Sequence, residues 1–110
     1  MGKIKTIKTE PTRKYEIFIG GDYQTAVNLC QEYCAVGLCV TITPTVFAYT
    51  FGQEQGVRIG LVNYPRFPSS AERLESRAKD LGLFLLDGLA QGSFLIVGPN
   101  ETTWYSRRDD

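Results

Sequence analysis

Two apolar stripes at helical spacing enclose two runs of alternating apolar residues, and this order constrains the fold more than any other feature. The stripes cover residues 23–36 and 69–92, where apolar side chains recur every three or four positions. Residues 39–51 and 57–64 alternate in the manner of strands, with Gly52–Gly56 as the expected hairpin turn. A helix, an antiparallel hairpin and a second helix are therefore predicted in that order.

Further strand-like segments complete the pattern on both sides. Residues 15–19 alternate before the first helix, and residues 93–97 and 102–106 follow the second. The order β-α-β-β-α-β plus a tail predicts an α+β, ferredoxin-like domain whose antiparallel sheet carries both helices on one face. We expect a basic flexible or edge-strand arm at 1–14, one domain at 15–106 and a charged tail at 107–110.

Local signals refine these elements. Asp22 is placed to cap the first helix, and Ser69 with Glu72 has the spacing of a capping box for the second. Gly37 and Gly92 are the expected helix ends. Pro44 lacks the amide that a central ladder needs, so a bulge or bend is expected there.

Charge and hydropathy exclude several classes of partner. Twelve basic and twelve acidic residues cancel, so we do not expect nucleic acid as a partner, and electrostatic repulsion between copies does little to prevent self-association. No apolar run reaches the length that spans a bilayer, and the first 14 residues lack the apolar stretch of a signal peptide. We expect a cytoplasmic protein without a membrane partner.

The chain has no histidine and three closely spaced cysteines. The absence of histidine excludes Ser-His and Cys-His catalysis and histidine-based zinc sites. Cys30, Cys34 and Cys39 suit reduced thiols, and the first two share the apolar stripe of the first helix. Core packing is the favoured interpretation over a soft-metal site, and no metal or cofactor is expected.

A resemblance to a known family adds to this pattern. The segments Tyr15 to Asp22, Cys39-Val-Thr-Ile-Thr-Pro44 and Phe47-Ala-Tyr-Thr-Phe51 resemble the CutA proteins of the PII-like superfamily over about residues 15–105. The resemblance implies a homotrimer and, for the PII branch, small ligands bound in clefts between subunits. The family's His-Pro-Tyr-type element is replaced by residues 87–92, so an inherited copper role is in doubt.

Aromatic and arginine side chains form the candidate binding site. Aromatic planes stack on bases and guanidinium groups hold phosphates, and the candidates are Tyr49, Phe51, Arg58, Tyr64, Arg66, Trp104 and Arg107. Packing between subunits is the alternative, because interfaces are enriched in the same residue types. The two interpretations overlap where a cleft lies between protomers.

These observations predict a non-catalytic, oligomeric protein that binds a small nucleotide-like or anionic ligand. No pair of acids has a spacing that compels a shared catalytic site, so no catalytic residue is assigned. The alternative is a small regulator or inhibitor that acts on a larger protein through a strand edge or its aromatic surface.

Overall fold

The expected elements are present in the computed structural model, which describes residues 2–109. The strands and helices are β1 (Lys14–Gly20), α1 (Tyr23–Tyr33), β2 (Thr41–Tyr49), β3 (Gly52–Val62), α2 (Ala71–Gly88), β4 (Ser93–Val97) and β5 (Thr102–Ser106). A 3₁₀ turn, η1 (Cys34–Val36), continues α1 and ends at Gly37, whose φ of 101° lies in the left-handed region that glycine adopts without strain.

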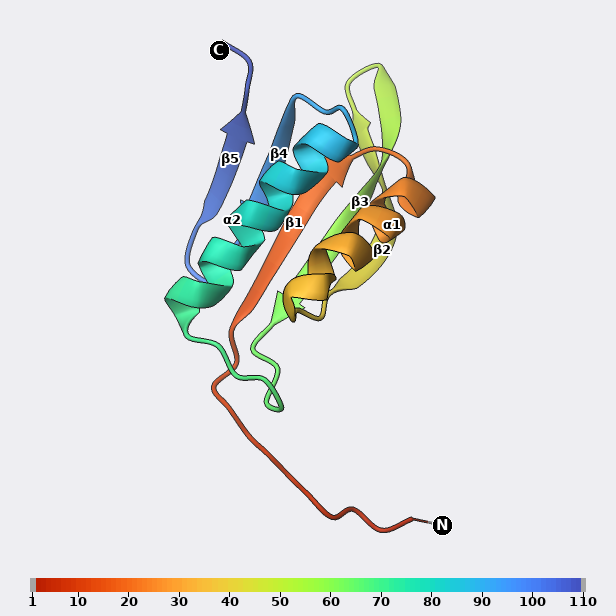
Figure 1. Cartoon of the computed structure of the whole chain (residues 1–110). Helices are drawn as coiled ribbons and strands as arrows, with labels where there is room; N and C mark the ends of the chain where they lie inside the picture. Colours follow the sequence, from red (N-terminus) through yellow and green to blue (C-terminus); the bar gives the residue numbers. More distant parts are fainter. Residues whose placement is uncertain (1, 110) are drawn as a thin grey trace.

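The five strands form one antiparallel sheet in the order β2-β3-β1-β4-β5. Both helices lie on the same side of this sheet, and the opposite side carries no helix (Figure 1). The prediction of an α+β, ferredoxin-like fold is therefore confirmed. No helix within residues 2–109 has the length and apolarity that crossing a membrane requires.

The core lies between the helices and one face of the sheet. Alternate residues of β1, β3 and β4 point into it because side chains of a strand alternate between the two faces. Apolar residues of α1 and α2 complete it from the other side. The largest side chains buried there are Ile17, Ile19, Ile59, Leu61, Leu74, Leu81, Leu85 and Val57.

The helix ends differ in detail from those expected. Asp22 caps α1 as predicted, since its Oδ2 accepts from the Thr25 backbone amide at 3.0 Å. The cap of α2 is Ser70 and not Ser69, because the Ser70 hydroxyl accepts from the Arg73 amide at 3.1 Å. The same helix ends at Gly88, four residues before the expected stop at Gly92.

The hairpin is longer and more regular than the sequence suggested. Its register is unbroken from Thr41 opposite Gly60 to Tyr49 opposite Gly52. The expected bulge at Pro44 is absent. β2 is an edge strand that pairs with one neighbour only, so a proline without an amide can lie in it without interrupting the pairing. Gly52–Gly56 belongs to β3, so the turn contains only two residues, and Phe51 adopts a φ of 66° there.

The face of the sheet away from the helices, called the open face below, is lined by a mixture of apolar and charged side chains. Because Phe18 pairs with Leu95 and Leu95 pairs with Trp104, these three side chains form a row across β1, β4 and β5. Trp104 is 51% exposed. No element within residues 2–109 covers this row.

The buried side chain of Asn63 joins the N-terminal arm to the connector before α2. Its Nδ2 donates to the Pro11 carbonyl, and its Oδ1 accepts from the Ser69 amide, both at 2.8 Å. The Arg13 side chain also reaches the Ser69 carbonyl at 2.9 Å. These bonds fix residues 11–13 against the connector, while the rest of the arm extends away from the sheet (Figure 1).

Replacing Asn63 with alanine is expected to destabilise the protein by about 2 kcal/mol, because two backbone groups lose their partner in a buried place. Hydrogen exchange at the Ser69 amide should accelerate at the same time. Denaturant unfolding and exchange measured by mass spectrometry test both effects. The control is Asn28→Ala, an exposed amide on α1 that is expected to change stability by less than about 0.5 kcal/mol. Equal effects of the two substitutions would contradict this role.

Candidate functional site

A hollow of about 290 Å³ lies on the open face, at the end of the sheet where β1 ends and β4 begins. The hairpin contributes one wall, and β4 and β5 contribute the other. Its lining combines three aromatic rings with three polar side chains: Phe18, Phe47, Trp104, Glu54, Gln91 and Arg108. A concave site lined by aromatic rings and a few convergent polar groups is typical of small-molecule binding.

The strand register brings these side chains together from distant parts of the sequence. Phe47 of β2 lies opposite Glu54 of β3, so both point to the open face. Phe18 of β1 and Trp104 of β5 flank Leu95 of β4 on the same face. Strand pairing therefore places one carboxylate between aromatic rings that come from different strands.

The backbone of Gly20 lines the hollow, and Gly20 is paired with a second glycine. Gly20 lies opposite Gly56 in the β1–β3 ladder. A Cβ at Gly20 would lie 2.8 Å from Gln91 Oε1 and 3.2 Å from Glu54 Oε2, and a Cβ at Gly56 would overlap the ring of Phe47. The absence of side chains at both positions lets the carboxylate, the amide and the ring approach the backbone closely.

The charged groups of the hollow are free to bind a ligand. Within residues 2–109 neither Glu54 nor Arg108 has an ion-pair partner, and both are exposed. The Arg108 guanidinium lies against the backbone of Gly92, where a Cβ would be 2.8 Å from its Nε. A carboxylate and a guanidinium in one hollow can receive a ligand that carries both a positive and a negative group.

Four of the seven predicted binding residues lie at the same end of the sheet as this hollow. Trp104 lines it, and the Tyr49 ring lies over Gly52 nearby on the hairpin. Phe51 is at the tip of the hairpin turn and fully exposed. Arg107 follows β5 and pairs with Asp87 at 2.9 Å, away from the lining.

The other three predicted residues lie elsewhere. Arg58 is on the open face but pairs with Glu16, with its Nε 3.5 Å from Oε2. Tyr64 and Arg66 belong to the connector at the opposite end of the sheet, where both neighbour the Phe67 ring. The seven candidates therefore do not form a single cleft.

Of the six side chains named above for the lining, five were missing from the sequence-based set: Phe18, Phe47, Glu54, Gln91 and Arg108. Glu54 was placed in a turn, although it keeps the parity of Arg58 along the strand that contains Val57 and Ile59. Continuing this alternation back to Gly52 would have found it. No comparable signal places Gln91 or Arg108 in the hollow, because Gln91 lies in the connection between α2 and β4 and Arg108 follows β5, where strand alternation does not apply.

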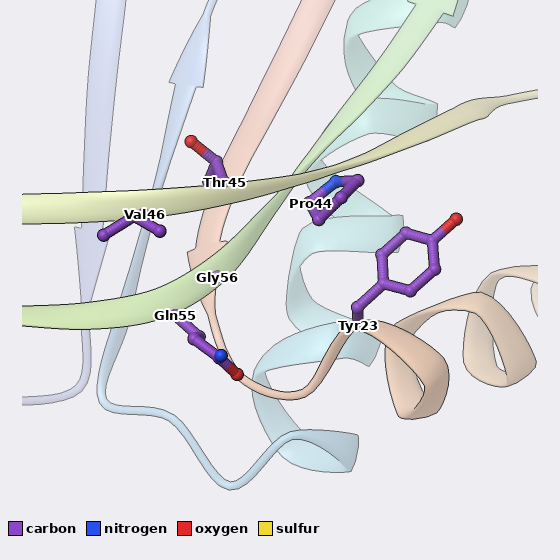
Figure 2. A pocket seen from close by; sticks show the side chains of 6 residues that line it. All are labelled: Tyr23, Pro44, Thr45, Val46, Gln55 and Gly56. Atoms are coloured by element: carbon purple, nitrogen blue, oxygen red, sulfur yellow. The ribbon is translucent and has the colours of Figure 1, made fainter.

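A second hollow, of about 210 Å³, lies between the start of α1 and the edge strand β2. Figure 2 shows the Tyr23 ring reaching from α1 toward Pro44, with Thr45, Val46, Gln55 and Gly56 around the same space. None of these side chains carries a charge, so this hollow lacks the groups needed to orient a charged ligand by ion pairing.

The cysteines do not form a metal site in the described part of the chain. No group of three potential metal-ligating side chains converges within residues 2–109. Cys30 is buried in the core, and burial, followed by the neighbouring Cys34, raises the pKa of its thiol to about 12. Burial also raises the pKa of Cys34, so neither thiol is poised to bind a metal as thiolate.

The fold is similar to that of solved structures from two groups of proteins. No protein-family model and no curated protein sequence matches the chain. A phage SAM lyase in the apo state matches with a TM-score of 0.70 and 15% identity, covering 89% of this chain and 91% of that chain. A phage SAM lyase in complex with S-methyl-5′-thioadenosine matches with a TM-score of 0.64 and 12% identity, covering 94% and 96%.

CutA from Synechococcus elongatus matches with a TM-score of 0.50 and 21% identity, covering 91% of this chain and 84% of that chain. This likeness supports the fold part of the resemblance found in the sequence. The matches to a lyase contradict the predicted function, because a lyase is an enzyme and the chain was predicted to be non-catalytic. The predicted PII/CutA-type binding function and its alternative, a regulator of a larger protein, are both non-catalytic, and both therefore disagree with the matches to the SAM lyase.

Proposed function

We propose that the chain is an enzyme that binds S-adenosylmethionine (SAM) in the hollow of the open face and cleaves it to release S-methyl-5′-thioadenosine. The observation that carries the proposal is the coincidence of two findings. The fold is similar to that of a phage SAM lyase, one structure of which holds S-methyl-5′-thioadenosine. The hollow offers aromatic rings, a carboxylate and a guanidinium, which suit the parts of this substrate.

Each part of the substrate has a matching group in the lining. The adenine base stacks on an aromatic plane, for which Phe47 and Trp104 are available. The Glu54 carboxylate accepts hydrogen bonds from the α-ammonium group, and the Arg108 guanidinium donates to the α-carboxylate. The sulfonium then lies between the aromatic and the charged parts of the hollow.

The reaction breaks the bond between sulfur and the four-carbon amino-acid fragment. The electron pair of this bond goes to sulfur, which leaves as the neutral thioether. In one route, the carbon that lost this pair forms a new bond to the fragment's own carboxylate oxygen, which gives a lactone. In the other, the electron pair of a β C–H bond forms a carbon–carbon double bond and the proton goes to a base, which gives an unsaturated amino acid. Positive charge on sulfur disappears in either case, so the step is favoured when ligand binding displaces water from the aromatic rings of the hollow.

Incubation with SAM is expected to yield S-methyl-5′-thioadenosine, with no oxygen from water in the second product. Chromatography, NMR of the four-carbon product and mass spectrometry in ¹⁸O-labelled water measure this. Glu54→Gln is expected to lower kcat/KM by roughly 10- to 100-fold, because a charged hydrogen-bond acceptor is lost. Glu32→Gln, an exposed carboxylate on α1, is the matched control. Unchanged SAM, or equal activity of the two variants, would overturn the proposal.

We also propose that the chain assembles as a homotrimer through the open face. A face with Phe18, Leu95 and Trp104 in one row leaves apolar surface in contact with water, and burying such surface drives association. Because the net charge is zero, electrostatic repulsion between copies is weak and does little to oppose association. A neighbouring copy on this face would also shield the hollow, where Glu54 and Arg108 are exposed in the single chain.

Leu95→Glu is expected to convert trimers into monomers, because it places a charge in the centre of the open face. Light scattering coupled to gel filtration measures the mass. Leu83→Glu is the matched control, since Leu83 is an exposed apolar residue of α2, on the helical side of the molecule. A monomeric wild-type protein, or trimers of both variants, would exclude this interface.

A further inference from the structure

A third hollow, distant from the proposed SAM site, is lined by two arginines and no acid. It has a volume of about 170 Å³ and lies between the first half of α2 and the chain that follows η1. Arg73 and Arg77, one turn apart on α2, line it together with Ser69. Tyr64 and Phe67 form its rim. It belongs to the end of the sheet from which the N-terminal arm extends (Figure 1).

The Arg77 side chain carries a hydrogen-bond donor that nothing in the described chain satisfies. Its Nη1 is buried and has no hydrogen-bond partner within residues 2–109. Within residues 2–109 the ion pairs involve Arg58 and Arg107, and neither Arg73 nor Arg77 forms one. Buried guanidinium donors are normally paired, because an unpaired donor has lost its hydrogen bonds to water without gaining others in the protein. An acceptor from outside the chain would resolve this imbalance.

The surroundings of the two arginines are rigid and positively charged. The connector that forms the rim is fixed by Asn63, whose Oδ1 accepts from the Ser69 amide at 2.8 Å. The Arg13 side chain donates to the Ser69 carbonyl at 2.9 Å, which adds a third guanidinium near the hollow. Lys8 of the N-terminal arm lines a neighbouring hollow together with Tyr64, so it adds positive potential on this side of the molecule.

We propose that this hollow binds a phosphate group through the guanidinium groups of Arg73 and Arg77. Two guanidinium forks and a serine hydroxyl match the several oxygens of a tetrahedral dianion, whereas a single carboxylate would occupy only one fork. The volume admits a phosphate group, and the Tyr64 and Phe67 rings, with centroids 5.8 Å apart, lie where the rest of a phosphate ester would emerge. The inference goes beyond the proposed SAM cleavage and involves different residues.

Calorimetric titration of the full chain with inorganic phosphate, at constant ionic strength adjusted with sodium chloride, tests the proposal. Binding by the wild type is expected, and Arg77→Gln and Arg73→Gln should each weaken it by roughly 10- to 100-fold, since a charged donor is lost. Lys79→Gln removes the same charge from the same helix and should change the affinity less than about twofold, because Lys79 lies over the Tyr105 ring on another side.

A second variant separates loss of binding from loss of folding. Arg77→Met removes the buried donor but keeps an unbranched side chain, so its Tm in phosphate-free buffer is expected to equal or exceed that of the wild type. The increase of Tm on adding phosphate should disappear in this variant. An Arg77→Met protein that unfolds at a lower temperature would mean that the Nη1 group has a partner within the protein, and would overturn the inference.

Ribose 5-phosphate as a second titrant distinguishes free phosphate from a phosphate ester. Equal affinity for the two titrants identifies free phosphate as the ligand, and tighter binding of the ester indicates that the Tyr64 and Phe67 rim takes part. No binding of either titrant to the wild type, or equal binding by wild type and Arg77→Gln, would contradict the site. Because neither titrant contains a sulfonium or a thioether, these results are independent of SAM cleavage.

Discussion

The placement of both helices on one face of the sheet is the constraint on which the other features depend. Strand side chains alternate, so every inward residue of β1 and β3 that packs on a helix has an outward neighbour without cover. Phe18, Leu95 and Trp104 are such outward neighbours. The same alternation that builds a closed core therefore leaves one face of the sheet uncovered, with a row of apolar side chains among charged ones, and this face holds both the hollow and the surface proposed for assembly.

The proposed site depends on backbone geometry as much as on its side chains. Gly20 and Gly56 face each other across the β1–β3 ladder, and the ring of Phe47 occupies the space that a side chain at Gly56 would need. The two-residue turn then sets the register that places Glu54 opposite Phe47. A shift of the hairpin by one residue would move this carboxylate to the other face of the sheet.

The sequence was sufficient for the order of elements and insufficient for the site. Apolar periodicity predicted all five strands and both helices, because burial of one face selects each period. It misplaced the turn, since a strand containing Gly52 and Gly56 resembles a loop in composition. Tyr64 and Arg66 were grouped with Trp104 because residue type suggests chemistry but not location, and the topology separates them to opposite ends of the sheet.

The most direct test of the proposed site is an NMR titration of the ¹⁵N-labelled protein with S-methyl-5′-thioadenosine. The account predicts shifts of the Gly20 and Glu54 amides and of the Trp104 indole N–H, because these residues line the hollow in which the nucleoside would stack on an aromatic ring. Amides on the outer surfaces of α1 and α2 should remain unchanged. An absence of shifts, or shifts confined to the helices, would contradict the assignment of the open face as the binding surface.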